Sequence, residues 1–297
     1  MSGRIQITEI SEKRFNALAG RSRNPRAKMF AKEIGWFSNS DESIIGALLL
    51  DLTDDDYMAL LLGKDSRGQY RCFNFGGPYE IQEEAVEWIH LQIKFLTVQG
   101  EKKFPQGDET SPLLDLFTPV VTPEKQHPYF TKLNSDDAWI PAKAIINVIT
   151  PHFIDIDGNF VKEFQTHGFD ARLWELYLDQ FLAEQEFTNS REYNAPDFMV
   201  SKENSEIAIE AVIVGRKKEN PPEYFKLSAD LFKSVNVEEE TKNAMPIRYG
   251  SPLYSKLKKK YWDLPHVIGK PLLFDLAAFH DDQYMTWSFT AQIPYFY

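Results

Sequence analysis

The sequence predicts an α/β protein, with an α+β module at the N-terminus followed by a mixed sheet flanked by helices. Three observations predict this class. Short apolar runs separated by polar turns occupy residues 44–75, as in an antiparallel meander. Helical patterns alternate with apolar runs over residues 170–279, as in a sheet covered by helices. Five prolines fall within residues 101–134. We therefore predict a small module at 1–100, a proline-rich linker at 101–134 and a second domain at 135–297.

The N-terminal module is expected to contain helices and a three-stranded antiparallel meander. Residues 8–34 have a helical pattern that Pro25 interrupts. Turn-forming residues separate three apolar runs, and a stretch with helical spacing follows them. The predicted strands are Ile44–Leu50, Tyr57–Leu62 and Tyr70–Phe75, and the predicted helix is Ile81–Gln99.

The C-terminal domain is expected to have the order helix, strand, strand, helix, strand. Its first long helix is amphipathic and its second is basic, and its last strand is mostly apolar, which is typical of a buried strand. A further short helix precedes them. The predicted elements are the short helix Ala142–Ile149, the helix Asp170–Gln185, the strands Asp197–Ser201 and Ile207–Val214, the helix Ser251–Leu264 and the strand Leu272–Phe279.

Composition excludes several classes of protein. Of the 297 residues 43% are hydrophobic and 14% aromatic, which excludes disorder as the dominant state. The single cysteine excludes an internal disulfide and a cysteine zinc site. The first residues have no apolar signal core, and no apolar run approaches the roughly 20 residues that span a bilayer. We therefore expect a cytoplasmic protein with no membrane partner.

The charge is distributed unevenly. The net charge of −11 argues against a protein that coats nucleic acid, yet residues 213–270 hold 12 Lys and Arg against 7 Asp and Glu. Such a basic region is compatible with a phosphate-binding face. A solvated helix surface explains the same charges equally well.

Three carboxylates carry the strongest chemical signal. Glu175 lies in the amphipathic helix, Asp197 follows a proline at the start of a strand, and Glu210 lies in the middle of an apolar strand. A buried carboxylate is costly unless it is paired or bound to a cation. Adjacent hairpin strands bring Asp197 and Glu210 together, and Mg²⁺ relieves the repulsion of two carboxylates. The alternative is that Glu210 faces solvent on an edge strand and Asp197 is only a strand-entry residue.

The order of a helical Glu, a Pro-Asp and a strand Glu resembles the PD-(D/E)xK nuclease superfamily, whose fold is restriction-endonuclease-like. The resemblance covers roughly residues 165–285. It implies that Asp197, Glu210 and the carbonyl of Ala211 bind Mg²⁺ or Mn²⁺, with Glu175 as an accessory residue. The sequence departs from the family at position 212, where Val212 stands in place of the usual lysine. Some members supply this lysine from the next helix, and here we favour Lys256.

The resemblance implies a Mg²⁺-dependent nuclease that hydrolyses phosphodiester bonds, with DNA favoured as partner and DNA repair or defence as context. A basic face would hold the nucleic-acid backbone. The alternative function is a catalytically inactive nuclease-fold module that binds nucleic acid or regulates a partner, and a lysine within reach of Asp197 and Glu210 discriminates between the two. The oligomeric state is not decided by the sequence. A homodimer is possible because nucleases that cut both strands are often dimers, but no heptad pattern is present. The residues of the expected basic face are Arg216, Lys217, Lys218, Lys258, Lys259 and Lys260.

Overall fold

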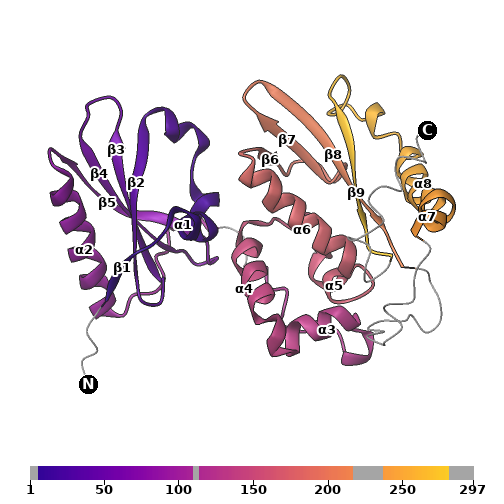
Figure 1. Ribbon diagram of the computed structural model, residues 1–297, viewed down its shortest axis with the longest axis horizontal. Coiled ribbons are helices and arrows are strands. Elements are labelled where there is room, and N and C mark those ends of the chain that lie inside the picture. The colour runs from indigo at the N-terminus through magenta and orange to yellow at the C-terminus, as the bar shows by residue number, and fades with distance from the viewer. Residues whose placement is uncertain (1–5, 110–113, 217–236, 281–297) are drawn as a thin grey trace. The chain divides into compact units, whose positions relative to one another are not determined.

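The computed structural model describes residues 6–109, 114–216 and 237–280, and the chain forms two compact units. One unit comprises residues 1–114 and 144–152, and the other comprises residues 115–143 and 153–297. Each unit combines helices with a β-sheet (Figure 1), which confirms the predicted α/β class. Within the described ranges, no helix is both long enough and apolar enough to span a bilayer.

The first unit contains a sheet that is antiparallel at every pairing. Within the described residues the sheet has five strands in the order β1-β2-β3-β4-β5. Two α-helices of this unit pack against the sheet. These elements are β1 (Ile7–Glu9), α1 (Glu12–Ala19), β2 (Ala31–Asn39), β3 (Ile44–Asp51), β4 (Tyr57–Lys64), β5 (Tyr70–Tyr79) and α2 (Gln82–Gln99).

Alternation along β3 divides the core of this unit between two faces. Ile44 and Leu48 pack against α2, whereas Ile45 and Ala47 point to the opposite face and pack against α1. The helix α2 approaches the sheet closely at Gly46. A Cβ atom there would lie 2.6 Å from Cγ2 of Ile89, so only glycine fits without displacing a neighbour.

One prediction for the N-terminal half is corrected. The sheet has two strands more than the predicted three-stranded meander, namely β1 and β2. These strands overlap the two ends of the segment 8–34, for which a helical pattern was expected. Here α1 ends at Ala19, and β2 carries a register shift between Glu33 and Gly35 that obscures its alternation. The proline-rich segment 101–134, expected to be a linker or a loosely helical connection, contains the start of helix α3 (Pro128–Ser135), in which Pro128 takes the first position, where proline is tolerated.

The second unit is built on a mixed sheet. Within the described residues its order is β6-β7-β8-β9, antiparallel from β6 to β8 and parallel between β8 and β9. The predicted long helix, two strands, helix and last strand occur in that order, but a short strand that was not predicted, β6, lies between the long helix and the first predicted strand. The helix α4 (Ile140–Ile149) crosses the boundary between the units, since its residues from Ala144 onwards belong to the first unit. The later elements of the second unit are α5 (Phe160–Gln165), α6 (Phe169–Glu184), β6 (Thr188–Ser190), β7 (Phe198–Lys202), β8 (Ser205–Val214), α7 (Val237–Glu239), α8 (Met245–Leu257) and β9 (Leu272–Ala278).

The strand β8 separates the two helix layers of this unit. Ile209 and Ala211 face the cluster that contains Leu178 of α6, whereas Val214 packs with Tyr249 of α8. Because side chains alternate along a strand, even-numbered residues such as Glu210 lie on the α8 face. A two-residue turn at 203–204 joins β7 to β8, with Lys202 paired to Ser205.

The basic helix lies earlier in the chain than the predicted range 251–264, since it begins at Met245. The helix α8 ends at Leu257, and Lys260 adopts a left-handed conformation with φ of 51° that is incompatible with continuing it. A 3-10 turn at Tyr261–Asp263 follows. The change of direction brings Tyr261 back over the sheet, where it is buried.

Candidate active site

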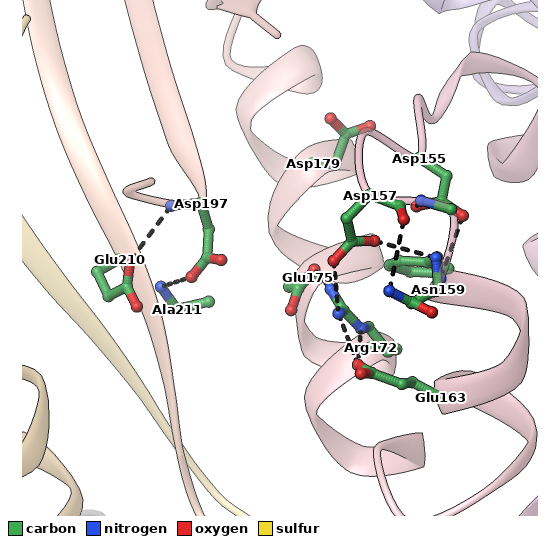
Figure 2. Close-up of polar contacts among 12 residues, drawn as sticks. Asp155, Asp157, Asn159, Glu163, Arg172, Glu175, Asp179, Asp197, Glu210 and Ala211 are labelled. Carbon is green, nitrogen blue, oxygen red and sulfur yellow. Dashed lines mark hydrogen bonds and ion pairs between the residues drawn. The ribbon is translucent and has the colours of Figure 1, made fainter. Parts of the chain in front are cut away.

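Asp197 and Glu210 lie next to each other at the start of β7. The antiparallel register pairs Phe198 with Ile209, so the residues just beyond this pair become neighbours. The amide of Asp197 donates to Oε2 of Glu210 at 3.3 Å, and the amide of Ala211 donates to Oδ2 of Asp197 at 2.8 Å (Figure 2). The predicted proximity of these two carboxylates is therefore present in the structure.

Glu210 is buried and paired. Its side chain is 3% exposed, and its strand lies between β7 and β9, so the alternative of a solvent-facing edge position is wrong. The ammonium of Lys256 on α8 donates to Oε1 of Glu210 and forms an ion pair with it. The hydroxyl of Tyr261 donates to the same oxygen at 2.6 Å. The carboxylate thus exchanges its hydration for two side-chain donors on Oε1 and a backbone donor on Oε2.

Val212 and Lys256 lie on the same side of the sheet. Val212 is on the same face of β8 as Glu210 and is 1% exposed. Lys256 brings a positive charge to this face from the helix that covers it. The arrangement is the one expected from the sequence if the lysine comes from the next helix.

Glu175 approaches the site from the opposite layer. It lies on α6, where Arg172 donates to its Oε2 at 2.8 Å from the preceding turn. Burial raises the pKa of Glu175 to about 7, the negative charge of Asp197 adds to the increase, and Arg172 opposes it. In Figure 2 its carboxylate extends from α6 toward the side on which Asp197 and Ala211 lie. Trp174 anchors this part of α6, since its indole Nε1 donates to the carbonyl of Asp275 on β9 at 3.1 Å.

The environment of Asp197 disfavours its charged form. Burial, and after it the neighbouring Glu210, raise its pKa to about 6 against the opposing effects of Lys256 and the amide of Ala211. Two adjacent acids with only partial compensation repel each other. A cation bound between them would relieve this repulsion.

Asp197 and Glu175 open onto a common pocket of about 140 Å³. Glu210 and Lys256 lie behind Asp197 and do not line it. Two arginines contribute to the wall: Arg172, which also binds Glu163, and Arg191, which binds the buried Asp179 at 2.7 Å. The complete lining is Phe153, Ile154, Asp155, Ile156, Asp157, Phe160, Arg172, Glu175, Arg191, Tyr193, Asn194 and Asp197.

The donor set at Asp197 and Glu210 fits a magnesium ion. Mg²⁺ typically takes one or two carboxylates and completes its shell with water and phosphate oxygens. Within the described residues Asp197 accepts one hydrogen bond, at Oδ2, which leaves Oδ1 for another ligand. The N–H and C=O of one strand residue point to the same side, so the carbonyl of Ala211 also faces Asp197. Three or more His, Cys, Asp or Glu side chains do not converge on one metal position anywhere in the described part of the chain.

The expected basic face is only partly visible. Lys217 and Lys218 lie outside the described residues. Lys258, Lys259 and Lys260 are exposed after α8. Arg216 differs from them because it is half-buried, with its guanidinium 4.9 Å from the ring centre of Tyr129 on α3.

Sequence analysis missed two residues at the site. Arg172 stands three residues before Glu175, and the i, i+3 spacing of opposite charges is a signal that could have found it. Tyr261 gives no such signal, because its contact with Glu210 depends on the turn that ends α8.

Comparisons with known proteins found no protein similar to this chain. No family model matches the chain, and searches of curated proteins and of solved structures found no match either.

Proposed function

We propose that the second unit is a Mg²⁺-dependent nuclease that hydrolyses phosphodiester bonds, with DNA as the favoured substrate. The observation that carries the proposal is the ion pair of Lys256 with Glu210, directly beside Asp197. A nuclease site needs acidic metal ligands together with a cation close to the reacting phosphate. Here the acids come from a hairpin, and the cation comes from a helix 46 residues further along the chain.

Each residue of the site has a role in the proposed reaction. Asp197 and Glu210, with the carbonyl of Ala211, would hold the metal. When bound there, Mg²⁺ would lower the pKa of a water molecule and neutralise charge on the phosphate. Lys256 donates from Nζ to a phosphate oxygen as negative charge develops. Glu175, with a pKa of about 7, exchanges a proton at its carboxylate near neutral pH.

The exposed lysines after α8 supply the binding surface in this proposal. Lys258, Lys259 and Lys260 are three consecutive positive charges that follow the helix carrying Lys256. Contacts of such side chains with phosphates give affinity that falls as salt rises, without recognising sequence. We therefore expect substrate binding that depends on salt rather than on base sequence.

The test combines metal binding with cleavage. Calorimetric titrations with Mg²⁺ and Mn²⁺, alone and with DNA present, would compare the full chain with Asp197→Asn, Glu210→Gln and Lys256→Met. Cleavage of plasmid and of single-stranded DNA would be measured with the same proteins. The control is Glu206→Gln, since Glu206 lies on the same strand but is exposed and binds Lys270 at 2.9 Å.

A nuclease requires that Asp197→Asn and Glu210→Gln lose metal binding and cleavage together, while Glu206→Gln keeps both. The variant Lys256→Met should still bind metal but lose cleavage by about 10²-fold or more, as is typical when a donor to transition-state charge is removed. Absence of cleavage by the unmodified chain on DNA and RNA, with either metal, would reject the proposal.

One observation favours a second candidate, an inactive nuclease-fold module that binds nucleic acid. Lys256 and Tyr261 already compensate the charge of Glu210 without a metal, so the buried carboxylate is stable as it stands. A structural ion pair needs no reaction. In that case the chain would bind DNA with equal affinity in the presence of Mg²⁺ and of a chelator, and would leave it intact.

A further inference from the structure

The two oxygens of Glu210 have different partners. Oε1 accepts from the ammonium of Lys256 and from the hydroxyl of Tyr261, both on the α8 side. Oε2 accepts from the amide of Asp197 at 3.3 Å and lies on the side where the second carboxylate stands. This second bond is near the upper end of the hydrogen-bond range, so Oε2 is the less strongly held oxygen.

Lys256 alone would not fix this arrangement. A lysine side chain ends in a flexible point charge whose three donors can serve either oxygen of a carboxylate. Its side chain is 27% exposed, and the proposed reaction requires it to turn toward a phosphate. A carboxylate held by Lys256 only would lose its orientation when the lysine moves.

Tyr261 has the rigidity that Lys256 lacks. It is 4% exposed, and its ring packs against Phe274 of β9 with a centroid separation of 6.4 Å. Its hydroxyl has one rotatable bond, and it donates to Oε1 at 2.6 Å because a carboxylate oxygen only accepts. The phenol therefore holds Oε1 in place whether or not Lys256 is there.

We propose that Tyr261 is a positioning residue that keeps Oε1 of Glu210 on the α8 side, so that Oε2 is presented toward Asp197 for a divalent cation. The inference rests on the proposed function, because it assigns Glu210 to the metal. It goes beyond the sequence resemblance by naming the residue that orients this carboxylate and the oxygen that faces the ion. Residues that orient a metal ligand typically contribute 10-fold to 100-fold to metal affinity.

The test uses Tyr261→Phe in the full chain, which removes the hydroxyl and keeps the ring. Mn²⁺ alone is the probe, titrated by calorimetry and by electron paramagnetic resonance, so that no cleavage is needed. The matched control is Tyr254→Phe, since Tyr254 lies on α8, is 58% exposed and does not contact Glu210 within the described residues. We expect the Kd for Mn²⁺ to rise at least 10-fold in Tyr261→Phe and to stay within twofold in Tyr254→Phe.

A crystal structure of Tyr261→Phe without metal makes the inference independent of activity. The carboxylate of Glu210 should turn in this variant, so that Lys256 no longer contacts the same oxygen. An unchanged carboxylate, or an unchanged Kd for Mn²⁺ in a folded variant, overturns the inference. If the unmodified chain binds no Mn²⁺ but the carboxylate turns in Tyr261→Phe, the proposed nuclease fails while the positioning of Glu210 stands.

Discussion

Replacing Lys256 with methionine isolates the energy of the buried ion pair. Methionine keeps an unbranched flexible chain and removes the ammonium group, with its charge and its hydrogen-bond donors. Removing one partner of a fully buried pair costs about 3 to 5 kcal/mol. The loss should be smaller here, because Lys256 is partly exposed and Glu210 keeps the hydroxyl of Tyr261 and the amide of Asp197. We expect the second unit to lose about 2 kcal/mol of unfolding free energy, in line with a hydrogen bond to a charged group.

Urea unfolding of the full chain at pH 7 measures this loss, with the transition of the second unit followed separately. A double-mutant cycle with Glu210→Gln isolates the pair. In the Gln background the lysine faces a neutral amide, so Lys256→Met should then cost less than about 0.5 kcal/mol, and the coupling energy should be about 1.5 kcal/mol or more.

A coupling energy below about 0.5 kcal/mol would refute this reasoning. It would mean that Lys256 contributes through the packing of its methylene groups and that the charge of Glu210 is compensated by other groups. The assignment of Lys256 as the cation of the site would then lose its energetic basis.

Three further outcomes are expected. The raised pKa values of Glu175 and Asp197 mean that folding disfavours their charged forms, so stability should fall as pH rises from about 4 to about 7, and Glu175→Gln should remove much of that fall in urea titrations. Gly46→Ala should destabilise the first unit by about 1 to 3 kcal/mol through the clash with Ile89, measured against Gly35→Ala, whose Cβ meets neighbours at no less than 3.5 Å. Lys258→Ala should weaken DNA binding and reduce by about one the slope of log affinity against log salt, and an unchanged slope would remove it from the interface.

The sequence predicted the parts of the site that depend on local patterns. Alternation and the polar turn located β7 and β8, and an acid within an apolar strand pointed to Glu210. Once those strands pair in register, the closeness of Asp197 and Glu210 is a geometric necessity. The choice of Lys256 followed from the resemblance, because some members of that superfamily supply this lysine from the next helix.

The parts that were not predicted depend on contacts between distant segments. In the sequence, the 3-10 turn that carries Tyr261 resembles a continuation of α8, although the helix ends at Leu257 and the left-handed Lys260 separates the two. The strand β2 was missed because a bulge interrupts its alternation. Residues 153–160 contribute to the wall of the pocket that Asp197 lines. Tertiary folding brings them there, and a local sequence pattern cannot predict such a contact.

The short connection between β7 and β8 has a consequence for how this protein can change. Most surface loops tolerate insertions because their length is independent of what they connect. The turn at 203–204 instead sets the pairing register of the hairpin, because it pairs Lys202 with Ser205. This register in turn makes Asp197 and Glu210 neighbours. A shift of one residue in pairing would move Glu210 to the layer of α6, away from Lys256. We therefore expect the length of this solvent-exposed turn to be invariant in descendants that keep the site, although none of its atoms lies near the chemistry.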